Sequence, residues 1–159
     1  MARIDFVTGA PEQYAHLVDR LATVAERTAA VLAGHTSAEL RRDPPDGWSA
    51  QRVLGHMAFH AHANGVFIHQ LATMTDPQRT PFPSGYEDPE LATRDPLELL
   101  QLIEDETAQT VALLSRTPDA AWGRPGFVRG ARRSLRQHVQ AHLDHFDDHI
   151  AQLAQVLSR

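Results

Sequence analysis

Four stretches of the chain repeat their apolar residues at alternating steps of three and four, which is the spacing of one face of an α-helix. No stretch sustains the period-two alternation of a half-buried strand, so the sequence predicts no sheet. Four amphipathic helices of this length pack naturally around a shared core. We therefore expect an all-α fold, a four-helix bundle. The predicted helices run from about Pro11 to Ala33, from Ser49 past Leu71, from Asp95 past Leu114, and from Ser134 to about Leu157.

Capping signals mark the starts of these helices. Ser49 and Asp95 are N-cap residue types, and Pro96 suits the first helical position. The segments Thr36–Glu39 and Ser134–Gln137 read as capping boxes, in which a hydroxyl and a longer polar side chain bond each other's backbone N–H groups. The first box predicts a short helical turn, and the second predicts the start of the last helix.

Two connections lack helical periodicity. The segment Thr75–Pro96 contains five prolines and is long for a loop in a compact domain. We expect it to cross the bundle or to cover a site. The second irregular stretch, Thr117–Arg133, precedes the last helix.

Composition narrows the classes of partner. A chain of 159 residues fits one domain, residues 1–159, and a formal charge of −5 leaves no excess of cations for a nucleic acid backbone. No apolar run reaches the roughly 20 residues that span a bilayer, and no signal-peptide pattern is present. We expect a cytoplasmic protein without nucleic acid or membrane partners. Because the chain has no cysteine, any thiol chemistry must use a thiol brought by a ligand.

Histidines dominate one face of the last predicted helix. His138, His142, His145 and His149 follow one another at steps of four, three and four. His145 and His149 can direct two imidazoles at one cation, as histidine pairs four residues apart do in helical zinc sites. The third ligand must come from elsewhere, and His56 on the second helix is the best candidate.

Spacing leaves alternatives open. His56 and His60 are also four residues apart and allow a rival pair on the second helix, whereas His62 faces elsewhere and His69 is expected on the surface. The four-histidine stripe covers ~16 Å of helix, too long for one metal. Any single histidine beside the apolar seam is more simply explained as solvated at the edge of the core.

Three neutral imidazoles on a divalent cation leave coordination positions open, as in catalytic metal sites. Imidazole nitrogen suits zinc, nickel, copper or iron. The other ring nitrogens need acceptors, and Asp144, Asp148 and Glu106 are candidates, although each is more simply a solvated carboxylate.

Two segments carry a family resemblance. Trp48-Ser49 followed by Val53-Leu54-Gly55-His56, together with the closing segment His145–Leu153, resembles the DinB-like (YfiT-like) family of metal-dependent enzymes. The resemblance implies a four-helix bundle with a crossover connection between helices 2 and 3, often dimeric, and a zinc or nickel ion held by three histidines. Carried over by motif, the ligands fall on His56, His145 and His149.

The same resemblance leaves His60 and His142 as residues that line the site. Characterised relatives include transferases that join bacillithiol or mycothiol to electrophiles, and a mycothiol-dependent maleylpyruvate isomerase. The expected function is a metal-dependent transferase that activates a low-molecular-weight thiol for a small-molecule electrophile, with Tyr86 as a possible substrate contact. The alternatives are a metal-dependent hydrolase, with His60 or a carboxylate as base, and a metal-binding stress protein without turnover.

Overall fold

The structure is a computed structural model that describes residues 11–158. Its longer helices are α1 (Ala15–Ala22), α2 (Val24–Leu32), α4 (Ala50–Thr73), α5 (Pro96–Ser115) and α6 (Leu135–Leu157). Shorter elements connect them: the 3-10 helices η1 (Glu12–Tyr14), η2 (Leu91–Thr93) and η3 (Asp119–Gly123), the helix α3 (Ser37–Arg41), and the strands β1 (Pro125–Val128) and β2 (Ala131–Ser134).

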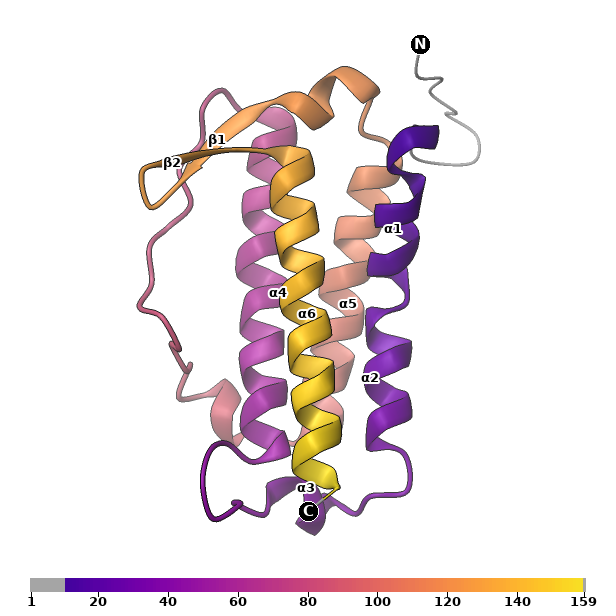
Figure 1. Cartoon of the computed structure of the whole chain (residues 1–159), viewed down its shortest axis with the longest axis vertical. Helices are drawn as coiled ribbons and strands as arrows, with labels where there is room; N and C mark the ends of the chain where they lie inside the picture. Colours follow the sequence, from indigo (N-terminus) through magenta and orange to yellow (C-terminus); the bar gives the residue numbers. More distant parts are fainter. Residues whose placement is uncertain (1–10, 159) are drawn as a thin grey trace.

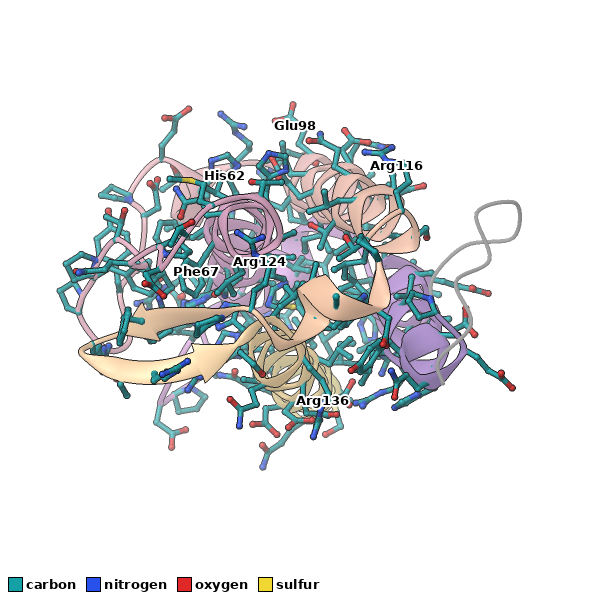
Figure 2. The ribbon with its side chains drawn as sticks, turned by 90° about the horizontal axis from the view of Figure 1, so that it is seen from above. His62, Phe67, Glu98, Arg116, Arg124 and Arg136 are labelled. Carbon is teal, nitrogen blue, oxygen red and sulfur yellow. The ribbon has the colours of Figure 1, made fainter. Side chains whose placement is uncertain are left out.

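The helices form a four-helix bundle. In Figure 1, α1 and α2 lie end to end and together form one column of the bundle. This column and the helices α4, α5 and α6 lie side by side. Figure 2, a view along the bundle, shows the helices arranged around one core, with Glu98 and Arg136 on opposite outer sides. The predicted all-α fold class is confirmed. Within residues 11–158, no helix is long and apolar enough to cross a membrane.

The core is built from the faces that the periodicity predicted. Burying a large apolar side chain contributes about 1.5–3 kcal/mol to the free energy of folding relative to leaving it exposed, so this core is the main source of stability. Its largest fully buried side chains are Trp122, Phe67, Phe146, Leu17, Leu21, Leu54, Met57, Ile68, Leu71, Leu99, Ile103 and Leu114.

The first helix differs from the prediction, because it breaks at Thr23. The Thr23 hydroxyl donates to the carbonyl of Arg20 at 2.8 Å, and the Thr23 backbone N–H bonds the same carbonyl at 3.1 Å. A threonine hydroxyl competes in this way with the regular helical ladder. Tertiary contacts hold both parts in line, since Asp147 of α6 accepts hydrogen bonds from Arg20 at 2.7 Å and from Arg27 at 2.8 Å.

The predicted caps are confirmed. Ser49 accepts the N–H of Arg52 at the start of α4, and Asp95 accepts the N–H of Leu97 at the start of α5. Reciprocal capping boxes open α3 at Thr36 and α6 at Ser134. These local bonds fix where each helix begins, and therefore which side chains face the core.

The predicted crossover between the second and third long helices is also confirmed. The chain leaves the upper end of α4 in Figure 1, descends beside α4, and enters α5 at the lower end, so that α4 and α5 run parallel. Two bonds tie its upper part to β1: the Arg79 N–H donates to the Phe127 carbonyl, and the Phe127 N–H donates to the Pro77 carbonyl, both at 2.9 Å.

The prediction of no sheet is wrong in one place. Strands β1 and β2 form a two-stranded antiparallel hairpin, in which Val128 pairs with Ala131. The turn residues Arg129 and Gly130 have φ angles of 52° and 78°, as a tight hairpin requires. Strands of four residues are too short for a visible alternation, and Arg-Gly is not the Asn-Gly or Asp-Gly signal that marks such turns.

Candidate metal centre

Three histidines from two helices converge between α4 and α6. Each of His56, His145 and His149 offers a ligand nitrogen, and these atoms all lie within 4.8 Å of one another. The Nε2 atoms of His145 and His149 are 2.9 Å apart. The His56 ring centroid lies 5.3 Å from that of His145 and 4.7 Å from that of His149.

Hydrogen bonds to the outer nitrogens orient two of the rings. His56 Nδ1 lies 3.1 Å from the Tyr86 carbonyl oxygen, which can only accept, so this nitrogen carries the proton. His149 Nδ1 lies 2.8 Å from Oε1 of Gln152, one turn further along α6. Both bonds leave the Nε2 lone pair directed at the shared space, which is the arrangement that metal-binding histidines adopt.

In the described part of the chain, the third ring has a nitrogen whose hydrogen-bonding capacity is not satisfied. His145 Nδ1 is buried and has no hydrogen-bond partner within residues 11–158, while its Nε2 faces that of His149. No tautomer satisfies both nitrogens of this ring. Two nitrogens that share a tetrahedral zinc ion lie about 3.3 Å apart, close to the observed separation. The donor set and its spacing therefore fit a divalent cation.

Lowered pKa values keep two of the three imidazoles, those of His56 and His145, neutral, as metal ligands must be. Burial, and then the neighbouring His149, lowers the pKa of His145 to about 4. Burial, and then His149, also lowers the pKa of His56. Beside them, burial and the His145 ring lower the pKa of His60 to about 2.

His60 and His142 lie near the site outside the three-histidine group. The His60 ring centroid is 4.3 Å from that of His56 and 4.3 Å from that of His145. His142 is buried against Phe146, and its Nδ1 lacks a hydrogen-bond partner among the described residues. His60 therefore contacts two of the three grouped histidines, and the lining role that the resemblance implies for His60 and His142 stays a prediction.

The simpler expectation of solvated histidines is wrong for two residues of the stripe. His138 and His142 are only 2% and 3% exposed. His138 Nε2 lies 2.9 Å from Oδ1 of Asn64, and the Asn64 amide nitrogen lies 3.2 Å from His60 Nδ1. A buried polar network thus extends along α4 and α6 beyond the candidate metal centre.

The hydrogen-bond acceptors next to the three histidines differ from the carboxylates that the sequence suggested. Asp144 accepts from Gln140, Glu106 binds His62, and Asp148 is exposed. The acceptors found are the Tyr86 carbonyl and the Gln152 amide. Gln152 lies three residues after His149, a helical spacing that could have indicated it, whereas no sequence pattern indicates a backbone carbonyl.

Aromatic side chains cover the outer side of the histidines. Phe59 packs against His60, Phe82 and Tyr86, with centroid distances of 5.5, 5.1 and 5.0 Å. The ring centroids of Trp48 and His56 lie 5.2 Å apart in a T-shaped arrangement. The side chain of Tyr86, expected to contact a substrate, packs within this cover, and its carbonyl orients His56.

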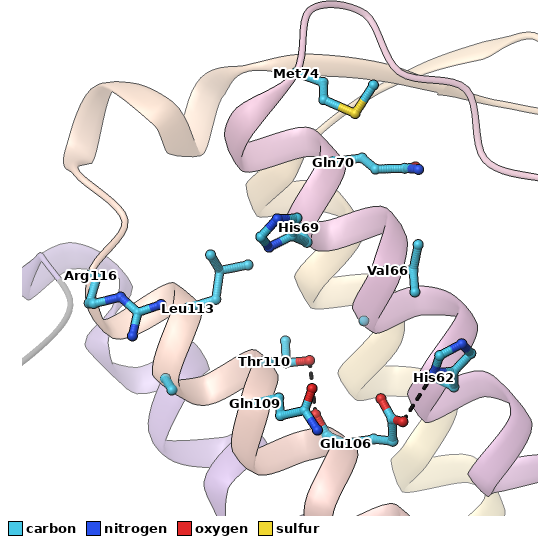
Figure 3. A pocket seen from close by; sticks show the side chains of 12 residues that line it. His62, Val66, His69, Gln70, Met74, Glu106, Gln109, Thr110, Leu113 and Arg116 are labelled. Carbon is cyan, nitrogen blue, oxygen red and sulfur yellow. Dashed lines mark hydrogen bonds and ion pairs between the residues drawn. The ribbon is translucent and has the colours of Figure 1, made fainter.

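A separate surface hollow of about 650 Å³ lies between α4 and α5 (Figure 3). His62 and His69 line it, and both are exposed, as expected for His69. His62 Nδ1 lies 3.1 Å from Glu106 Oε1. None of the three grouped histidines lines this hollow. It is therefore distinct from the candidate metal centre.

Comparisons with known proteins agree with this architecture. The DinB superfamily model matches residues 20–153. YfiT from Bacillus subtilis, a probable metal-dependent hydrolase with an unusual four-helix bundle topology, superposes with a TM-score of 0.81 at 20% identity, over 91% of this chain and 86% of that one. No protein of curated function matches the chain. Since the family model covers most of the sequence, the chain belongs to the DinB superfamily.

Proposed function

We propose that the protein is a metal-dependent transferase that activates a low-molecular-weight thiol, of the bacillithiol or mycothiol type, for conjugation to a small electrophile. The observation that carries this proposal is the group of imidazoles from His56, His145 and His149, which offers three nitrogen ligands. Zinc or nickel suits this donor set. When bound at three imidazoles, such a cation lowers the pKa of a thiol or water that takes a remaining coordination position.

The chain's own residues prepare the site for this chemistry. The Tyr86 carbonyl and Gln152 hold two rings in the tautomer that presents Nε2. The aromatic cover of Trp48, Phe59 and Phe82 limits the access of water, which otherwise competes with a thiol for the electrophile.

The reaction forms a bond between the thiol sulfur and an electrophilic carbon. The thiol proton passes to solvent, and the leaving group of the electrophile departs with the bonding electron pair. The absence of cysteine from the sequence favours this reading, because no side-chain thiol competes for the site.

Metal-dependent hydrolysis is the second candidate, and the description of YfiT as a probable metal-dependent hydrolase favours it. The surroundings of the site argue against a strong general base. A histidine with a pKa of about 2, as for His60, accepts a proton poorly at neutral pH. Glu87, whose charge acts on His56, is engaged by Arg52 through two hydrogen bonds at 2.7 and 3.2 Å.

The first test measures metal content. Elemental analysis of the purified protein, before and after treatment with a chelator, should find about one equivalent of zinc or nickel. His56→Ala and His145→Ala should abolish stoichiometric binding, because each removes a ligand. His62→Ala is the matched control, since His62 lies on the same helix as His56 but at the exposed hollow. Equal loss in all three variants would contradict the site.

The second test separates the functions. The metal-loaded protein is assayed for conjugation of a low-molecular-weight thiol to a model electrophile, and in parallel for hydrolysis of activated esters and amides. Thiol-dependent turnover that disappears in His145→Ala supports the transferase. Hydrolysis without a thiol supports the second candidate. Metal binding without either activity leaves the third reading, a metal-binding stress protein.

A further inference from the structure

Three arginines converge where the crossover meets the β1–β2 hairpin, beside the upper part of α4 and α6 in Figure 1. Arg79 lies on the crossover, and Arg129 and Arg133 lie on the hairpin. Arg79 places its Cζ atom 4.6 Å from the centroid of the Phe82 ring, and Arg129 donates to the Phe82 carbonyl at 3.2 Å. Both guanidinium groups therefore contact Phe82, Arg79 at its ring and Arg129 at its carbonyl.

A buried polar pair brings in the third. Asn64 Oδ1 accepts from Arg79 Nη1 at 3.3 Å and lies 2.9 Å from His138 Nε2. His138 Nδ1 lies 3.4 Å from Arg133 Nη1. Because the arginine can only donate, His138 accepts at Nδ1 and donates from Nε2 to Asn64. Arg79 and Arg133 thus meet opposite ends of one hydrogen-bonded pair.

The positive charge of this cluster is not balanced. Within residues 11–158, ion pairs with Asp or Glu engage Arg20, Arg27, Arg41, Arg52 and Arg94, and none engages an arginine of the cluster. Burial, and then the charges of Arg129 and Arg133, lowers the pKa of Arg79. An acidic protein, with 20 Asp and Glu against 15 basic residues, here gathers cations without counterions.

The donor capacity of the cluster is also unused. A guanidinium group carries five N–H donors in a planar fork that matches a carboxylate or a phosphate. Arg79, Arg129 and Arg133 each make one side-chain hydrogen bond in the described part of the chain. Most of their donors therefore have no protein acceptor.

The cluster lies one layer of side chains from the candidate metal centre. His60 bridges the two, because its Nδ1 lies 3.2 Å from the Asn64 amide and its ring centroid lies 4.3 Å from that of His145. Phe82, which meets two of the arginines, has its ring centroid 5.3 Å from that of His60. Guanidinium groups so close to the histidines would repel a metal cation bound there. An anion bound among the three arginines would offset this repulsion.

We propose that Arg79, Arg129 and Arg133 form an anion-binding site that holds a carboxylate or phosphate group of the substrate while its reactive part reaches the three-histidine site. This inference deepens the proposed function, on which its substrate role rests, by assigning the substrate to a chemical class. Along α4, Asn64 lies about 12 Å beyond His56, so the anionic group and the reacting atom are several bonds apart. Binding of the anion itself requires neither metal nor turnover.

Calorimetric titration of the full-length protein with inorganic phosphate, and separately with succinate, tests the site. We expect saturable binding of one equivalent of at least one of these anions in the millimolar range, and the preferred probe distinguishes phosphate from carboxylate. Arg79→Gln and Arg133→Gln should each weaken binding by about 10–100-fold, since each removes a charged donor. Arg79→Lys should retain part of the affinity, because the charge stays and the planar fork is lost.

Two controls locate the anion. Arg132→Gln removes the same charge from the neighbouring residue of β2, whose side chain is exposed on the opposite face of the hairpin. It should leave the affinity within about twofold. His145→Ala disrupts the candidate metal centre and should retain anion binding. This result would support the anion site even if the protein proved not to be a thiol transferase.

Three outcomes would overturn the inference. The first is no saturable binding of either anion. The second is equal weakening by Arg132→Gln and by Arg79→Gln, which would indicate a general effect of net charge. The third is loss of binding in His145→Ala with no change in the folded Arg79→Gln and Arg133→Gln variants, which would place the anion at the histidines. Circular dichroism confirms that each variant is folded.

Discussion

Gly55 allows the crossover to approach α4 next to the candidate ligand His56. A Cβ atom at this position would lie 2.9 Å from the Leu91 carbonyl oxygen, 3.0 Å from the Leu91 carbonyl carbon and 3.3 Å from the Ala92 Cα. These are backbone atoms of η2, and they cannot rotate away as the end of a side chain can. We therefore expect Gly55→Ala to strain the contact between η2 and α4.

The magnitude follows from two opposing effects. Replacing a mid-helix glycine with alanine stabilises a helix by about 0.8–1 kcal/mol. Forcing an extra carbon into a packed contact costs about 1–3 kcal/mol. Gly65 of the same helix provides a matched control, because its added Cβ would meet only the Thr110 Oγ1, at 3.0 Å. This oxygen is a side-chain atom, which donates to the Glu106 carbonyl at 3.1 Å, and it can give way by a few tenths of an ångström more easily than the backbone of η2.

The helix-propensity gain cancels between Gly55→Ala and Gly65→Ala. Gly55→Ala should therefore be less stable than Gly65→Ala by about 1–3 kcal/mol, measured by urea denaturation. Displacement of η2 should also disturb the Tyr86 carbonyl that orients His56, so metal affinity should fall by up to about tenfold in Gly55→Ala alone. Equal stability and equal metal affinity of the two variants would refute this reasoning.

Other predictions concern the buried polar groups. Gln152→Ala removes the acceptor of His149 Nδ1 and should weaken metal binding by about 10–100-fold, while Gln155→Ala, on the exposed side of α6, should have no effect; metal titration checks both. Burial lowers the pKa of His138 to about 3 in the folded protein, from 6.5 for an unperturbed histidine. As the pH falls, the unfolded state therefore takes up this proton first, and the folded state loses stability between about pH 6.5 and pH 3. Lowering the pH to about 4.5 should cost on the order of 2–3 kcal/mol through this residue. His138→Gln should reduce the loss of stability between pH 7 and pH 4.5 by a similar amount, and an unchanged acid sensitivity would show that His138 is not its source.

The sequence predicted those features that depend on residues close together in the chain. The capping box at Ser134 and the N-cap at Ser49 involve bonds over three residues, and their geometry follows from the local backbone. The pairing of His145 with His149 has the same origin, because residues four apart lie on one face of a helix. The break at Thr23 was missed, since threonine is tolerated within helices and its hydroxyl bond is one of several choices open to it.

Helical spacing alone could not choose between His56 and His60 as the partner of the last helix. Both residues are buried on the same face of α4 and both face α6. The structure distinguishes them by their outer hydrogen bonds: His56 Nδ1 donates to the Tyr86 carbonyl, and His60 Nδ1 contacts the Asn64 amide. The family resemblance favours His56, and the bond from its Nδ1 to the Tyr86 carbonyl leaves its Nε2 free to bind a cation.

The sequence by itself determined the long helices α4, α5 and α6, their starts and the histidine pair on α6, because these depend on interactions within one or two helical turns. Tertiary structure decided the rest. It brought α4 against α6, laid the Tyr86 carbonyl on His56, buried His138 and His142, and gathered Arg79 with the two hairpin arginines. Such contacts join residues far apart in the chain, and they form only where the packing of the whole bundle offsets the entropy of closing the long loops between them.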